Sequence, residues 1–128
     1  MKTENTIWIL RIIAAGILLQ TLFFKFSGAA ESIYIFSALG AEPYGRIGSG
    51  IAELILAVLI LIPKTTWIGA LGGCGIMIGA ILSHLLVLGI VVENDGGFLF
   101  LLAVITLLCC LGLLYFNKNK LFNLLNFK

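Results

Sequence analysis

The sequence predicts an all-α membrane protein in which four transmembrane helices form one bundle, with a short external helix between the first two. Of its 128 residues, 61% are hydrophobic and 11% are charged, whereas a soluble domain carries roughly 25% charged residues. The mean hydropathy is +1.16. A chain of this size cannot bury so much apolar surface within itself, so the excess must face lipid. We therefore expect a single transmembrane domain over residues 1–128 and no soluble module.

Four apolar runs account for the predicted spans: residues 7–24, 47–62, 67–92 and 98–116. About 20 residues, rising 1.5 Å each, cross the ~30 Å hydrocarbon core of a bilayer. The second run is short and is expected to begin in the interface, while the third is long and is expected to tilt. The first run is not expected to be a cleaved signal peptide, because Arg11 interrupts it and Lys25 follows it.

The connection between the first two runs is predicted to contain an interfacial helix, Ala29–Leu39, whose apolar residues recur with a partial helical period. Gly40 is expected to end this helix, and Pro43 to begin the second transmembrane helix. The third connection, Glu93–Gly97, reads ENDGG and has the composition of a tight turn.

Lysine and arginine are distributed unevenly between the two ends of the spans. Of the eight in the chain, all but Lys25 and Arg46 lie in the termini, at the start of the first run or in the second connection. The positive-inside rule therefore predicts that both termini are cytoplasmic. Trp8, Trp67 and Tyr115 fall at the same predicted inner interface, where aromatic rings are enriched.

Glycines recur at a spacing of four in the third run. Gly69 and Gly73 form one such pair, and Gly75 and Gly79 form another. Small residues at this spacing allow helices to approach closely in a membrane. Two interpretations follow: the glycines pack the helix inside its own bundle, or they form a face for a second copy of the chain.

Polar residues from three different runs are predicted to lie at one depth, in the outer half of the membrane. Counted from the outer end of its own helix, Glu53 is about 10 Å deep, His84 about 13 Å and Gln20 about 7–8 Å. Lys25 and Arg46 lie just above this layer. Ionisable side chains within spans usually face the bundle interior or a wet cavity and pair there.

The expected pairs are Glu53 with Lys25 or Arg46, and Glu53 with His84. This layer has two interpretations, which do not exclude one another. It is a buried polar network that holds four helices in register, or an outward-opening pocket that binds a polar molecule or moves a proton. Arg11 lies near the inner end of the first helix, and its side chain is expected to extend to lipid phosphate.

Several classes of function lack their sequence features. No basic stripe with interleaved aromatic residues suggests nucleic-acid binding. Cys74, Cys109 and Cys110 lie in apolar runs without a C-x-x-C pair, so they are expected to be small buried hydrophobes. One histidine and scattered carboxylates do not supply the three or four ligands of a zinc site. No catalytic residue is assigned, and no catalytic activity of its own is expected.

Five segments, in their order and spacing, resemble the DoxX-like family of small four-helix bacterial membrane proteins. They are FFKFSG (23–28), LGAEP (39–43), GIAEL (50–54), GAILSHL (79–85) and DGGFLF (95–100). The resemblance covers about residues 7–116. It implies a bundle in the bacterial inner membrane and singles out Lys25, Glu53 and His84. The family takes its name from subunits linked to a thiosulfate:quinone oxidoreductase, and some relatives accompany redox proteins.

The leading hypothesis is an accessory subunit of a redox system that binds a quinone, a lipid or another small amphipathic molecule. Its predicted site is an outward-facing pocket formed by Gln20, Lys25, Arg46, Glu53 and His84. One alternative is a structural or assembly protein without a ligand. Another is a small proton-coupled transporter with Glu53 and His84 as a relay. The expected partners are the lipid bilayer and either a redox enzyme or a second copy docked through Gly69, Gly73, Gly75 and Gly79. Neither a metal nor nucleic acid is expected.

Overall fold

The computed structural model of the chain describes residues 2–91 and 96–118, whose regular elements are all helices. These are α1 (Lys2–Ser27), α2 (Ala30–Ala38), α3 (Tyr44–Leu61), α4 (Thr66–Ser83), the π-helix η1 (His84–Leu88) and α5 (Phe98–Phe116). α1, α3, α5 and the continuous segment of α4 and η1 are each long and apolar enough to cross a membrane. The predicted all-α fold with four spans is confirmed.

The end of the third span differs most from its prediction. The helix stops at Leu88, and Gly89 follows with a φ of +81°, a left-handed conformation that favours glycine. The apolar run continues past this point, so hydropathy alone extended the span to residue 92, which lies outside the described residues. The predicted ENDGG turn also lies largely outside them, although Gly96 and Gly97 both have positive φ.

The short helix predicted between the first two spans is confirmed as α2, which begins and ends within one residue of its predicted bounds. Leu39 caps it, and Gly40 follows with a φ of +73°. Pro43 is the N-cap of α3, as predicted.

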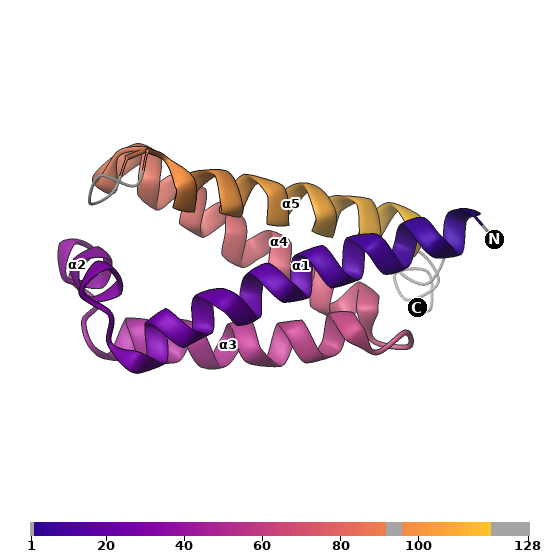
Figure 1. Cartoon of the computed structure of the whole chain (residues 1–128), viewed down its shortest axis with the longest axis horizontal. Coiled ribbons are helices and arrows are strands. Elements are labelled where there is room, and N and C mark those ends of the chain that lie inside the picture. The colour runs from indigo at the N-terminus through magenta and orange to yellow at the C-terminus, as the bar shows by residue number, and fades with distance from the viewer. Residues whose placement is uncertain (1, 92–95, 119–128) are drawn as a thin grey trace, which may run out of the picture.

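The four long helices form a closed ring in which each packs against two others. α1 and α4 each pack against both α3 and α5. α2 lies at one end of the bundle, between the α1–α3 side and the η1–α5 side, and the N-terminal end of α1 lies at the opposite end (Figure 1). α2 therefore covers one end of the space that the ring encloses.

Small side chains dominate the core of this ring, and large apolar side chains dominate its outer surface. The core includes Ala14, Ala15, Ala57, Ala70, Ala103, Cys74, Cys109 and Cys110. Leu86, Phe23 and Leu108 are among the large apolar residues that are well exposed. Buried polar residues include Arg11, Glu53, Thr66 and His84. Close packing of small residues with apolar groups outside is the arrangement of helices in lipid. The three cysteines are buried, as predicted.

The four glycines of α4 do not form one face. A Cβ at Gly69 would lie 2.8 Å from the Ile60 backbone nitrogen, and one at Gly73 would lie 2.7 Å from the Cys110 sulfur. Gly75 and Gly79 have open space at the same position. At 3.6 residues per turn, Gly73 and Gly75 point about 160° apart. The prediction of a single Gly69/Gly73/Gly75/Gly79 face is therefore wrong: the first pair packs inside the bundle and the second faces outward.

This division predicts opposite results for two alanine substitutions on one helix. Gly69→Ala is expected to lower the free energy of unfolding by about 1–3 kcal/mol, because the added methyl group meets the backbone of α3. Gly75→Ala is expected to leave it unchanged or slightly raised, since alanine favours helix. Unfolding in mixed micelles, followed by circular dichroism, measures both. Equal effects would contradict the assignment of faces.

Arg11 does not extend to lipid phosphate. The residue is 5% exposed, and its Nε and Nη2 donate hydrogen bonds to Thr66 Oγ1 at 3.1 and 2.9 Å. Its guanidinium also lies 4.4 Å from the centre of the Trp8 ring. The prediction was wrong because the start of α4 brings a hydroxyl acceptor to the facing side of α1. Arg11 therefore ties α1 to α4 toward the end of the bundle opposite α2 (Figure 1).

Candidate functional site

A cavity of about 340 Å³ lies at the end of the bundle that α2 covers. Residues of α1, α2, α3, α4, η1 and α5 all contribute to its wall. Most of the wall is apolar and includes Met77, Leu99 and Leu102. Its polar members are Gln20, Thr21, Lys25, Ser32, Ser49, Glu53, Ser83 and His84. A mostly apolar cavity with a few polar groups is the usual form of a small-molecule site.

Lys25 and Glu53 form an ion pair in the cavity wall. Lys25 Nζ lies 2.5 Å from Glu53 Oε1 and donates a hydrogen bond to it. Lys25 belongs to the last turn of α1, and Glu53 lies in the middle of α3, the helix packed beside it. Glu53 is 3% exposed, and Lys25 Nζ also lies 5.6 Å from the centre of the Phe36 ring on α2. The predicted Glu53–Lys25 pair is confirmed, and it joins α1 to α3 at the cavity, close to α2.

Arg46 does not pair with Glu53. Its Nε donates hydrogen bonds to both carboxylate oxygens of Glu42 at 2.9 and 3.0 Å, and its Nη1 donates one to the backbone oxygen of Lys25 at 2.5 Å. Arg46 is not among the residues that line the cavity. Its predicted partner was wrong because Glu42, one helical turn earlier, lies closer along the chain. Arg46 instead ties the end of α1 to the connection before α3.

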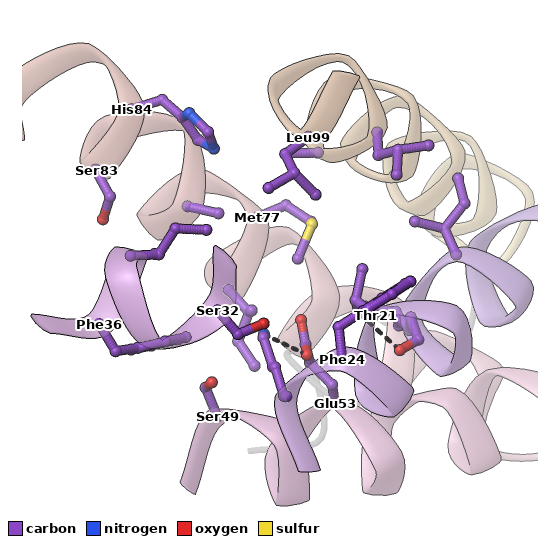
Figure 2. A pocket seen from close by; sticks show the side chains of 18 of the residues that line it. Thr21, Phe24, Ser32, Phe36, Ser49, Glu53, Met77, Ser83, His84 and Leu99 are labelled. Atoms are coloured by element: carbon purple, nitrogen blue, oxygen red, sulfur yellow. Dashed lines mark hydrogen bonds and ion pairs between the residues drawn. The ribbon is translucent and has the colours of Figure 1, made fainter. Parts of the chain in front are cut away.

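His84 does not pair with Glu53 either. It is the first residue of η1 and is 5% exposed, and its Nδ1–H donates a hydrogen bond to the Gly89 backbone oxygen at 3.0 Å. Its ring packs edge-on against Phe100 of α5, with 5.5 Å between the ring centres. Figure 2 shows His84 and Glu53 on different sides of the cavity, with Met77 between them. The prediction of this pair was wrong because equal depth does not determine the direction in which each side chain points.

The structure thus brings four of the five predicted residues, Gln20, Lys25, Glu53 and His84, to one cavity. Sequence reasoning missed several hydroxyl groups in the same wall. Thr21 and Ser49 each lie four residues before a predicted residue, Lys25 and Glu53 respectively, and this spacing could have indicated a shared helix face. Ser32 of α2 carried no comparable signal, because only the folded structure places that helix over the cavity.

The arrangement is suited to hydrogen bonding with a small molecule. One side of the cavity offers the ion pair and hydroxyl groups, the other side offers the His84 imidazole with the Ser83 hydroxyl beside it, and the wall between them is apolar (Figure 2). The described residues contain no group of three or more His, Cys, Asp or Glu side chains placed to share a metal ion. Comparison of the chain with protein-family models, with curated proteins and with solved structures finds no match.

Proposed function

We propose that the chain is a DoxX-like protein of the bacterial cytoplasmic membrane. In this proposal, it is an accessory subunit of a redox system and binds a small amphipathic molecule, such as a quinone or a lipid, in the cavity beneath α2. The observation that carries the binding role is the cavity of about 340 Å³, whose apolar wall contains the Lys25–Glu53 ion pair. The redox role rests on the resemblance of the five sequence segments.

The size of the cavity favours a compact ligand. Its volume is near the lower end of the roughly 300–1,000 Å³ usual for ligand pockets. Such a space suits a ring system or a single short chain and is too small to enclose a phospholipid with two acyl chains. A larger amphiphile would place only its polar end in the cavity and leave its tail between helices.

The position of the ion pair supports a binding role over a purely structural one. Burying two charges carries a desolvation cost that often equals or exceeds the gain from their attraction, so apolar residues would hold two helices together at least as well. Lys25 and Glu53 lie instead in the wall of a cavity, where a polar group of a ligand can meet them. With both termini in the cytoplasm, as the lysine and arginine distribution favours, this cavity lies toward the outer surface.

Native mass spectrometry of the protein extracted from its host membrane tests the proposal. We expect a bound small molecule in the wild type and its loss in Ala80→Trp, because Ala80 lines the cavity and the indole would fill it. Ile78→Trp is the matched control. Ile78 lies on the same helix but is 48% exposed on the outer surface, so this variant should retain the molecule.

Absence of any bound molecule from the wild type would contradict the binding proposal, as would equal occupancy in Ala80→Trp and the wild type. Either result would favour the structural or assembly role instead. Identification of the released molecule by its fragmentation then distinguishes a quinone from a lipid.

A further inference from the structure

We infer that the molecule bound in this cavity is uncharged and presents a hydroxyl group to Nε2 of His84. The inference rests on the proposed function and adds the chemical class of the ligand to it. Three features of the cavity carry it: the hydrogen bond of His84, the pairing of its charged groups and the placement of its polar groups on two sides.

The hydrogen bond of His84 determines which ring nitrogen is available. A backbone oxygen only accepts hydrogen bonds, so Nδ1, which lies 3.0 Å from the Gly89 oxygen, carries the proton. In the neutral ring Nε2 is then an acceptor. The residue is 5% exposed and lines the cavity, and within residues 2–91 and 96–118 the one hydrogen bond of its side chain is the Nδ1 bond to Gly89. A ligand group that meets Nε2 must therefore donate a hydrogen bond.

The charged groups in the cavity wall neutralise one another. Lys25 and Glu53 form an ion pair, and the other polar groups of the wall are hydroxyls, an amide and the imidazole. Arg46 is the next basic residue along the chain from Lys25, and it is paired with Glu42. An ionic ligand would have to separate the Lys25–Glu53 pair or lose its hydration without a counterion, and either carries a large cost in a low-dielectric site. An uncharged ligand avoids both costs.

The polar groups lie on two sides of an apolar middle. His84 and Glu53 occupy different sides of the cavity, and Met77 lies between them in Figure 2. An ammonium group has three N–H donors, so Lys25 can donate to a ligand oxygen while it keeps its bond to Glu53. The complementary molecule is an apolar body with an oxygen at each end, of which the one toward His84 is a hydroxyl.

Biphenyl derivatives test this inference, because they share one apolar body and differ only at the ends. Isothermal titration calorimetry on the full-length protein in detergent measures binding of 4,4′-dihydroxybiphenyl, 4,4′-dimethoxybiphenyl and 4′-hydroxybiphenyl-4-carboxylate. In Ala80→Trp the indole fills the cavity, so titration of this variant measures the heat that comes from partition of the compounds into the micelles. We expect the dihydroxy compound to bind about 5- to 10-fold more tightly than the dimethoxy compound, the effect of one net hydrogen bond. The carboxylate is expected to bind about 10-fold or more weakly than the dihydroxy compound.

His84→Asn separates the two ring nitrogens. The asparagine amide nitrogen occupies nearly the place of Nδ1 and can keep the bond to Gly89, while nothing replaces Nε2. In this variant the affinity for the dihydroxy compound and the affinity for the dimethoxy compound should agree within about 2-fold. Because the comparison is made within one variant, a general loss of stability does not imitate the result.

Equal affinity for the diol and the diether in the wild type would overturn the hydroxyl assignment. If the carboxylate binds as tightly as the diol, the ligand is not restricted to uncharged molecules and that part of the inference is overturned. If the preference for the diol persists in His84→Asn, the role of Nε2 is overturned. If none of the three compounds binds the wild type more strongly than it binds Ala80→Trp, the inference as a whole is overturned. The proposed function is decided separately, by the native mass spectra.

Discussion

Lys25→Met is expected to lower the free energy of unfolding by about 3–5 kcal/mol, the usual effect of removing one partner from a buried ion pair. The reason is that Glu53, 3% exposed in the wall of the cavity, would lose the ammonium group that now lies 2.5 Å away. The carboxylate must then stay buried without a counterion or take up a proton, and both cost free energy. Unfolding by dodecyl sulfate in mixed micelles, followed by far-ultraviolet circular dichroism, measures the change. Lys64→Met is the control, because Lys64 is an exposed residue in the connection between α3 and α4.

The double variant Lys25→Met/Glu53→Gln removes both charges and is expected to recover most of the lost stability. It also separates the two interpretations of the polar layer. If the layer only holds helices in register, the double variant should behave as the wild type in every assay. If the cavity binds a ligand through these groups, the double variant should fold but lose the bound molecule. A cost for Lys25→Met no greater than that for Lys64→Met would contradict the buried pair.

Thr66→Val is expected to lower the free energy of unfolding by about 2–3 kcal/mol, although it replaces a hydroxyl with a methyl group of similar size. Thr66 Oγ1 accepts both described side-chain hydrogen bonds of Arg11. Within the described part of the chain, no carboxylate forms an ion pair with the Arg11 guanidinium. Hydrogen bonds to buried charged groups are worth about 1.5–3 kcal/mol. The substitution leaves the charge buried beside Trp8 without an oxygen partner.

Thr106→Val is the matched control for this result. Thr106, like Thr66, is fully buried, but its hydroxyl donates only to the Leu102 oxygen of its own helix. Its loss is expected to cost less than about 1 kcal/mol, since the carbonyl keeps its helical bond. The double variant Arg11→Met/Thr66→Val should regain much of the stability. Equal costs for the two threonine variants in the same unfolding assay would show that Arg11 does not depend on Thr66.

Among the described residues, three polar contacts that join one long helix to another divide between the two ends of the bundle. Arg11 and Thr66 join α1 to α4 at one end, while Lys25 and Glu53 join α1 to α3 at the end that holds the cavity. Arg46 adds a third connection near the second of these, from α3 to the backbone at the end of α1. Beside the cavity, polar contacts therefore connect α1 to α3, whereas the described contacts of α2 with the bundle include the approach of Phe36 to Lys25.

The sequence by itself determined the elements and their depth. Hydropathy located four spans, and the partial helical period located α2 within one residue at each end. Counting along each helix put Gln20, Glu53 and His84 in one layer with Lys25 just above it, and all four line one cavity. This succeeds because an α-helix rises by a constant 1.5 Å per residue, so depth depends on sequence position alone. The exception, the end of the third span, was decided by the backbone conformation of Gly89 within a run that stays apolar.

Only the tertiary structure decided which polar groups meet. Arg46 pairs with Glu42, and Arg11 donates hydrogen bonds to Thr66. His84 donates to the Gly89 oxygen and packs against Phe100. None of these partners follows from depth. A partner depends on how far each helix is rotated about its axis and which helix lies beside it. Those rotations are set by close packing of small residues such as Ala14, Ala57 and Ala70, whose contacts form only when all four helices are assembled.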